Sequence, residues 1–429
     1  MRILIKYATV AGFILLLVPT PAYAYLDPGT GSMLLSVLIG LLSSAYFLVR
    51  KLPALFRAVL FKATGKGKLL ERKHIAIYGE TANYWGTFRP LLEEFGRRGE
   101  AVEYLTSSEN DPCFKADLPD CITCRYIGTG NTAYTTLNFL EADALVLTTP
   151  GIDVLQIRRS KGVKKYIHVL HSIGDPHFYK LFSFDYYDAV LCNGQYQVKS
   201  FRALEKVRGT QAKELPIVGC PYLDGLVERR RKEGDTPPDA NCVLVAPTWG
   251  RNGMLTRFGA AVPKMLAEAG YDVIFRPHPQ SFISEVEMMD RIMEELKPYP
   301  NITLDRNPDG FASLSRASMM VSDLSGVIFD FAFVFLRPVV TLQYELDPEG
   351  FEAFDIPHAR WNSEIVKELG WNLQESELER LPQIVKAISE KSGVAEHILK
   401  IRDANIANFG CAAKPIVDAI LEIADVEEK

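Results

Sequence analysis

Short apolar runs alternate along this chain with segments that have helical spacing. Five runs rich in β-branched and aromatic residues occur in the first half, at 75–78, 101–105, 144–147, 165–170 and 189–192. The segments between them, such as Phe88–Arg98, repeat apolar positions at helical intervals. This alternation predicts a parallel sheet with helices on both faces.

A second series of the same kind follows, with apolar runs at 242–245, 271–275, 302–304, 319–321 and 339–342. A charged stretch at 229–239, which contains two prolines, separates the two series and reads as a linker. The pattern predicts an α/β protein with two Rossmann-like, doubly wound domains, at 74–228 and 241–429. Ligands are expected between them, where the strands end.

The N-terminal pattern differs from the rest. Residues 1–24 have a basic start, an apolar run and a small-x-small ending, which predicts a cleavable signal peptide. Within 25–73, a second apolar run at 33–49 predicts a short transmembrane helix. If the signal stayed uncleaved, the chain would instead have two spans.

Basic residues dominate the stretch that follows residue 49, whereas the stretch before residue 33 carries a single acid, Asp27. The positive-inside rule then predicts a single-pass protein of the inner (plasma) membrane whose catalytic part is cytoplasmic. The apolar and basic segment 53–62 suits either the headgroup layer of anionic lipid or a plain linker helix. The motif Asp27–Ser32 has no assigned role.

Composition narrows the class of protein. A chain of 429 residues that is 48% hydrophobic and 24% charged has enough apolar residues for two globular cores. The net charge of −5 argues against a nucleic-acid partner. Seven scattered cysteines indicate a reducing compartment. The lone pair Cys121 and Cys124 reads as incidental, so neither a metal nor a cofactor is predicted.

A polar cluster in the second half has the order of an anion site. The apolar run 319–321 is followed by Ser322, Asp323, Ser325 and Gly326, and a helix is expected to start at Val327. A turn of small residues between a strand and a helix N-terminus is a natural seat for phosphate. An ordinary helix cap is the alternative interpretation.

Neighbouring strand ends carry further candidates for anion binding. The strand 271–275 ends in Arg276-Pro277-His278-Pro279, where two prolines fix a cation and an imidazole. After the strand 242–245, Thr248 is a candidate phosphate contact and Arg251 a candidate counter-charge. A cap would explain Thr248 equally well.

Two histidines close the fifth strand of the first domain. Alternation along that strand predicts His168 on a core face and carries His171 outward in the turn that follows. A neutral imidazole at His171 would accept a hydroxyl proton near neutral pH. We therefore expect a core role for His168 and a general base in His171.

The order and spacing of these segments resemble the CDP-glycerol glycerophosphotransferase family of teichoic-acid polymerases and primases, across about 164–340. The family's first-domain element is a His-Gly-Thr turn with a catalytic histidine, matched here by His171–Gly174. Its second-domain motifs are matched by four segments, Ala246–Trp249, Arg276–Pro279, Ser322–Asp330 and Arg337–Val340.

The resemblance implies a two-domain GT-B architecture that works without a bound metal. It also implies CDP-glycerol or a related CDP-polyol as donor, a glycan or lipid-linked acceptor, and release of CMP. By similarity His171 and His278 are catalytic, Arg276 helps to hold the pyrophosphate, and the 322–326 turn seats the phosphates or the glycerol. Fixed charges and dipoles suffice for such a transfer.

Departures from the family pattern leave the donor and acceptor open. The family's Gly-Thr is Ser172-Ile173 here, and its second serine is Gly326. One alternative is a GT-B glycosyltransferase that uses a nucleotide sugar, which the identity of the released nucleotide would distinguish. The other is a non-catalytic binding module tethered to the membrane.

Overall fold

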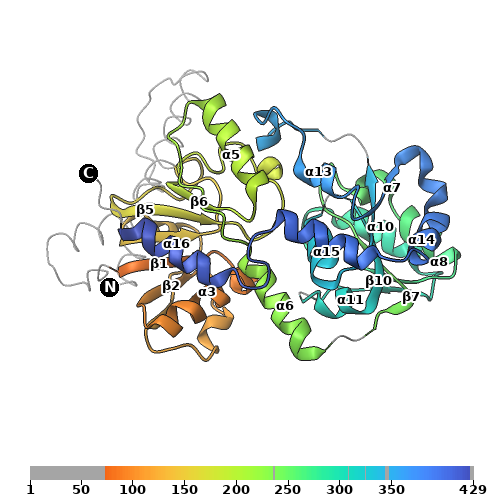
Figure 1. Ribbon diagram of the computed structural model, residues 1–429, viewed down its shortest axis with the longest axis horizontal. Helices are drawn as coiled ribbons and strands as arrows, with labels where there is room; N and C mark the ends of the chain where they lie inside the picture. Colours follow the sequence, from red (N-terminus) through yellow and green to blue (C-terminus); the bar gives the residue numbers. More distant parts are fainter. Residues whose placement is uncertain (1–72, 235–236, 308, 324, 344–346, 426–429) are drawn as a thin grey trace, which may run out of the picture. The chain divides into compact units, whose positions relative to one another are not determined.

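The computed structural model describes residues 73–234, 237–307, 309–323, 325–343 and 347–425 (Figure 1). The predicted signal peptide (1–24), transmembrane helix (33–49) and basic segment (53–62) lie outside these residues. Among the described helices, none is both long and apolar enough to cross a membrane.

The first domain is built on a parallel sheet of six strands in the order β3-β2-β1-β4-β5-β6. The strands are β1 (Lys73–Gly79), β2 (Val102–Thr106), β3 (Ile122–Tyr126), β4 (Glu141–Leu147), β5 (Gly162–Val169) and β6 (Ala189–Leu191). The longer helices are α3 (Trp85–Arg98), α4 (Asn131–Asn138) and α5 (Gln195–Arg208), and the short turns are η1 (Ala82–Tyr84), η2 (Pro112–Phe114) and η3 (Pro176–Phe178).

The second domain repeats this design with the order β12-β11-β10-β7-β8-β9. Its strands are β7 (Asp239–Ala246), β8 (Asp272–Phe275), β9 (Ile302–Leu304), β10 (Ala317–Ser322), β11 (Val339–Gln343) and β12 (Gly370–Gln374). Its helices are α7 (Met254–Phe258), α8 (Ala261–Glu268), α9 (Ser281–Ser284), α10 (Val286–Leu296), α11 (Phe311–Arg316), α12 (Val327–Phe329), η4 (Asp330–Val334), η5 (Glu352–Phe354), α13 (Trp361–Ile365), η6 (Glu375–Arg380), α14 (Leu381–Ser389) and α15 (Val394–Asn405).

The predicted α/β fold with two doubly wound sheets is confirmed, and strands form at each of the ten predicted apolar runs. Two strands were not predicted, β3 and β12. In both sheets the chain reverses its strand order between the first and fourth strands, which are β1 and β4, and β7 and β10. Ligands of open parallel sheets bind beyond the strand ends at such a switch point.

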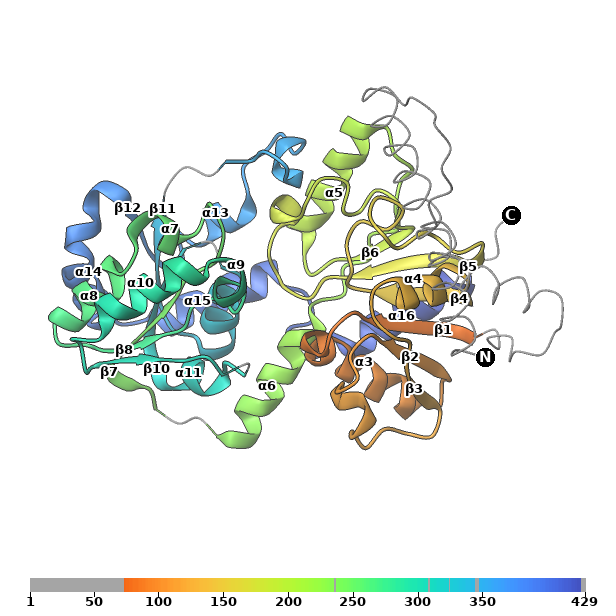
Figure 2. The same cartoon turned by 180° about the vertical axis from the view of Figure 1, so that it is seen from behind.

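The last helix, α16 (Ala413–Asp425), packs in the first domain, although the sequence assigned residues 241–429 to the second. Its apolar residues Ile416, Ile420 and Ile423 are buried against α3 and the first sheet, and Figures 1 and 2 both show α16 running beside α3. The Asp224 carboxylate on α6 (Pro221–Glu233) accepts the Ala413 N–H at 2.9 Å. The chain therefore leaves the first domain through α6 and returns to it at its end.

Residues 347–362, here called the strap, leave the second sheet and bind the first domain. Lys180 and Phe351 pair as an antiparallel bridge. The Asn362 N–H donates to the Asp175 carboxylate at 2.8 Å, and the Asp175 N–H donates to the Asn362 side chain at 3.0 Å. Arg208 on α5 pairs with Glu352 of the strap. The strap thus connects the two domains through polar contacts.

Candidate functional site

The carboxylate of Asp323 organises the ligand-facing edge of the second sheet. It is fully buried. One oxygen accepts the Thr248 N–H at 2.9 Å and the other accepts the Met254 N–H at 2.7 Å. The hydroxyl of Ser322, also buried, donates to the Ala246 carbonyl at 2.6 Å. Both side chains were predicted to touch a ligand; in the structure they hydrogen-bond within the protein and fix the end of β7 and the loop that follows it.

That loop is tight because two of its positions require glycine. Gly250 has a φ of +89°, a region that side chains disfavour. A Cβ at Gly253 would lie 2.9 Å from the Thr248 carbonyl oxygen. Within the described residues the half-buried hydroxyl of Thr248 makes no hydrogen bond, so it is available to a ligand. The loop also brings Trp249 onto His278, with ring centroids 6.1 Å apart.

His278 is held as a neutral hydrogen-bond donor. Its Nδ1 accepts the Gln280 N–H at 3.1 Å, which assigns the ring proton to Nε2. Partial desolvation lowers the pKa of His278, and Glu285 partly opposes this shift. Near neutral pH the imidazole therefore offers an N–H group at Nε2.

Arg276 has partners within the protein. Its guanidinium donates to Asp305 at 2.6 Å and to the Asn307 carbonyl at 2.7 Å. Burial opposes ionisation of Asp305, but hydrogen bonds from Ser313, Asn307 and Arg276 hold the pKa of this carboxyl below its usual range. Arg276 thus fixes the turn after β9, and only part of its guanidinium surface is left to face a ligand.

A cavity of about 260 Å³, here called the β8 cavity, opens beside Arg276. The Arg306 guanidinium lies 4.2 Å from the centre of the Phe282 ring on its wall. A cation, an aromatic face and polar turn atoms together suit a flat, anion-linked group such as a nucleoside. The lining consists of Arg276, Pro277, Pro279, Phe282, Ile283, Asp305, Arg306 and Asn307.

Arg251 points to the strap. Its guanidinium lies 3.0 Å from an Asp347 carboxylate oxygen and donates to the Glu349 carbonyl at 2.7 Å. It also lies 5.9 Å from the centre of the Phe351 ring. Arg251 was predicted to supply the counter-charge for donor phosphate. In the structure the Asp347 carboxylate already pairs with Arg251, so a phosphate would have to compete with it.

The loop that carries His171 is fixed by the start of α5. The Asn193 amide donates to the Ser172 carbonyl at 2.8 Å, and the Gln197 amide donates to the Gly174 carbonyl at 2.8 Å. The Tyr196 hydroxyl donates to the carbonyl between them, that of Ile173. Three consecutive carbonyls are therefore anchored, which restricts where His171 points.

His171 and His168 occupy different environments, as predicted. His171 is half-buried, edge-on to Tyr84 with ring centroids 5.2 Å apart, and burial lowers its pKa to about 4. His168 is fully buried among aromatic rings, where burial lowers its pKa to about 3. Within the described part of the chain, neither ring nitrogen of His168 has a hydrogen-bond partner. His168 is thus a neutral core residue, but one that lacks polar partners.

The His171 loop meets the 325–326 turn of the second domain. Ile173 belongs to the apolar core that contains Ile328 and Phe329. A Cβ built on Gly326 would lie 3.9 Å from the Cβ of Ser172. This contact brings the loop of the predicted base next to the predicted phosphate turn.

Asp330 is a candidate that sequence reasoning left without a role. It lies one helical turn beyond Gly326, and burial raises its pKa to about 7. No cation pairs with it in the described part of the chain, and it raises the pKa of the neighbouring Tyr222. Asp330 can therefore gain or lose a proton near neutral pH. The sequence did not predict this property, because it depends on how Asp330 is packed in the fold.

Metal ligands are not grouped at this site. Across the described ranges, no three His, Cys, Asp or Glu side chains are arranged to hold a metal ion.

Residues 181–349 match the family described as CDP-Glycerol:Poly(glycerophosphate) glycerophosphotransferase. This match confirms the family resemblance and supports a transferase. The matched segment contains every predicted second-domain site residue, from Thr248 to Gly326, whereas His171 lies before it. Among proteins of curated function, none matches the sequence.

The fold is similar to that of solved structures. A structure titled wall teichoic acid polymerase TagF, a histidine variant soaked with CDPG, superposes with a TM-score of 0.53 at 16% identity, covering 87% of this chain and 96% of that one. A Listeria monocytogenes protein named for UDP-N-acetylglucosamine 2-epimerase activity also gives a TM-score of 0.53, at 12% identity, covering 83% and 98%. At these identities the likeness shows the fold alone, and it agrees with the predicted GT-B architecture.

Asp323 and Ser325 differ in their hydrogen bonds, so we expect substitutions at the two positions to have different effects on stability. Asp323→Asn replaces one carboxylate oxygen that accepts a backbone N–H, so we expect the free energy of unfolding to fall by about 1–3 kcal/mol. Ser325→Ala removes a half-buried hydroxyl without a partner in the described residues and should leave stability within about 0.5 kcal/mol. Urea unfolding of both variants measures this. Equal losses of stability would contradict the assigned roles.

Proposed function

We propose that this protein is a membrane-anchored transferase that moves glycerophosphate, or a related polyol phosphate, from CDP-glycerol to an acceptor hydroxyl and releases CMP. The observation that carries the proposal is the contact between the His171 loop and the 325–326 turn. In this contact the loop that carries the neutral imidazole of His171 faces the turn that leads into the helix at Val327. The family match over 181–349 supports the donor class.

In the proposed reaction the acceptor oxygen attacks the β-phosphorus of the donor. A new oxygen–phosphorus bond forms, the bond to CMP breaks, and the hydroxyl proton passes to His171. The charge that grows on the departing phosphate is met by the His278 Nε2–H, the Thr248 hydroxyl and the backbone N–H groups at the start of the helix at Val327. Fixed donors of this kind stabilise phosphoryl transfer because they need no reorganisation during the reaction.

The cytidine of the donor is placed in the β8 cavity, which adjoins the segment that bears His278. Arg306, stacked on Phe282, would lie against one face of the base. The acceptor is a glycan or a lipid-linked chain in cell-envelope polymer synthesis.

The membrane anchor is proposed from the sequence of residues 1–73. An apolar run at 33–49 followed by an excess of Lys and Arg supports one span, with the catalytic domains on the cytoplasmic side of the plasma membrane. We expect the full chain to stay with membranes through an alkaline carbonate wash and to dissolve in detergent. Its release by carbonate would contradict the anchor.

Replacement of the proposed base is the direct test of catalysis. We expect His171→Gln to lower kcat about 10²–10⁴-fold, because general-base assistance is lost. The control is His397→Gln, an exposed histidine on α15. The measurement is chromatography of the nucleotide released from CDP-glycerol with membrane extract as acceptor, with UDP-sugars in parallel. Release of UDP but not CMP would establish the nucleotide-sugar alternative instead.

The pH profile provides an independent test of the same residue. His171 acts as a base only when it is unprotonated, and burial lowers its pKa from 6.5 to about 4. Activity assigned to this group should therefore hold as the pH falls from about 7 to about 5 and decline near pH 4. A decline of kcat/KM centred near pH 6.5 would indicate an exposed imidazole in its place.

A further inference from the structure

Arg251 lies on the loop after β7 together with Thr248, a candidate phosphate contact, yet the proposed reaction gives this arginine no role. The strap binds its guanidinium: the Asp347 carboxylate lies at 3.0 Å, and the Glu349 carbonyl accepts a hydrogen bond at 2.7 Å. The side chains of Arg251 and Asp347 are 53% and 46% exposed. Water screens an ion pair at such exposure, so the pair is weak and a stronger anion can replace the carboxylate.

The next residue of the same loop adds to this connection. The Asn252 amide donates to the Asp347 carbonyl at 3.2 Å, and the Asp347 N–H donates to the Asn252 side-chain oxygen at 3.2 Å. The carboxylate oxygen of Asp347 that does not face Arg251 accepts the Glu349 N–H at 2.9 Å, which fixes its direction. Hydrogen bonds of both side chains and backbone therefore join the loop after β7 to the first residues of the strap.

The strap continues to the segment that follows the His171 loop. The Gly350 carbonyl accepts the Leu181 N–H at 3.2 Å, and the Glu352 N–H donates to the Tyr179 carbonyl at 2.8 Å. The Tyr179 ring lies edge-on to His171, with ring centroids 6.2 Å apart. The strap thus connects the loop after β7 to a neighbour of the proposed base.

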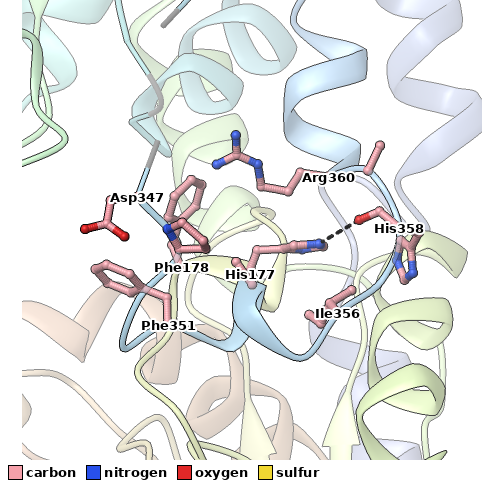
Figure 3. Close-up of a pocket in the computed structure, with 10 residues that line it drawn as sticks. His177, Phe178, Asp347, Phe351, Ile356, His358 and Arg360 are labelled. Atoms are coloured by element: carbon pink, nitrogen blue, oxygen red, sulfur yellow. Dashed lines mark hydrogen bonds between the residues drawn. The ribbon is translucent and has the colours of Figure 1, made fainter. Parts of the chain in front are cut away.

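Packing behind the strap is incomplete, so the strap depends on these hydrogen bonds. A cavity of about 210 Å³ lies between the strap and η3, and Asp347, Phe351 and Phe178 are among the residues that line it (Figure 3). The rings of Phe178 and Phe351 meet edge-on, with centroids 6.4 Å apart. Segments with few close-packed contacts and exposed hydrogen bonds open at a low free-energy cost. The start of the strap can therefore leave the loop without disturbing a core.

We propose that Asp347 is a positioning residue that pairs with Arg251 before a donor binds and that a donor phosphate displaces it. The inference rests on the proposed function, since the competing anion is the diphosphate of CDP-glycerol. A diphosphate carries more negative charge than one carboxylate and offers an arginine two acceptor oxygens. Its binding separates the strap from the loop after β7, while the strap's bonds to Leu181 and Tyr179 persist. That loop is then free to move relative to the segment beside His171.

The first test measures by calorimetry, at low salt, how tightly CDP binds to the full chain in detergent. Asp347→Asn removes the competitor from Arg251, so we expect CDP to bind about two- to fivefold more tightly, the range that an exposed ion pair contributes. Asp347→Glu keeps the charge and should retain the affinity of the unmodified chain. Glu349→Gln is the matched control, because Glu349 meets Arg251 and Asp347 through its backbone. It removes the same charge from the strap and should leave CDP binding unchanged.

A double variant connects the effect to the arginine. Arg251→Gln should weaken CDP binding, and Asp347→Asn added to it should bring no further gain, because the two side chains act as a pair. An equal gain from Asp347→Asn with and without Arg251 would show that the carboxylate acts on CDP by general repulsion, and it would overturn the proposal.

Hydrogen exchange at single-amide resolution tests the displacement itself. CDP should speed exchange at the Asp347 and Glu349 N–H groups, which are bonded to Asn252 and to the Asp347 carboxylate. The Leu181 and Glu352 N–H groups should not respond, because their bonds persist. Cytidine lacks phosphate, so it should leave all four amides unchanged. A merely structural role of Asp347 predicts no response to CDP.

The outcomes separate this inference from the proposed function. If CDP binds equally tightly to the unmodified chain and to Asp347→Asn, or leaves the Asp347 and Glu349 amides unchanged, the inference is overturned and the donor assignment stands. If CDP does not bind but pyrophosphate binds more tightly to Asp347→Asn, the donor assignment fails and the displacement of Asp347 stands. If neither anion binds, both are overturned. Thermal unfolding of each variant verifies that the substitutions leave the fold intact.

Discussion

The arrangement of the second domain's ligand-facing edge depends on one buried carboxylate, that of Asp323. It joins the end of β10 to the loop after β7, the two strands between which the chain reverses its order. Because the carboxylate is buried, each backbone N–H that it accepts is worth more than it would be in water. Trp249 and Thr248 lie on the loop that this carboxylate anchors, and Trp249 contacts the ring of His278. The residue that looked most like a phosphate contact is thus the one that holds the contacts in place.

The titratable residues of the candidate site differ in how their charge is reduced or balanced. Desolvation shifts the two candidate histidines, His171 and His278, toward the neutral form by lowering their pKa values. The cations Arg276 and Arg251 are balanced by carboxylates, at Asp305 and Asp347. Under the proposed function, a donor would therefore meet oriented dipoles more than unpaired positive charge, an arrangement that suits catalysis by preorganised groups.

The sequence predicted the fold well because buried parallel strands are nearly continuous apolar runs. The two strands it missed, β3 and β12, lie at sheet edges. Each has a single buried residue, Ile122 in β3 and Leu373 in β12, so neither forms an apolar run. The candidate site residues follow strand ends, as the sequence indicated, but their hydrogen-bond partners lie far away in the sequence. Ser322 and Asp323 face inward, and the shifted carboxyl of Asp330 arises from burial that no local pattern encodes.

The return of α16 to the first domain has a consequence for biosynthesis. Domains commonly fold in order as they leave the ribosome. Here the surface of the first sheet and of α3 that α16 covers stays open until α16 has been made, since Ile416, Ile420 and Ile423 complete that core. The second domain is therefore translated before the core of the first domain is complete. A nascent chain that stops before α16 would expose this apolar surface to chaperones and proteases.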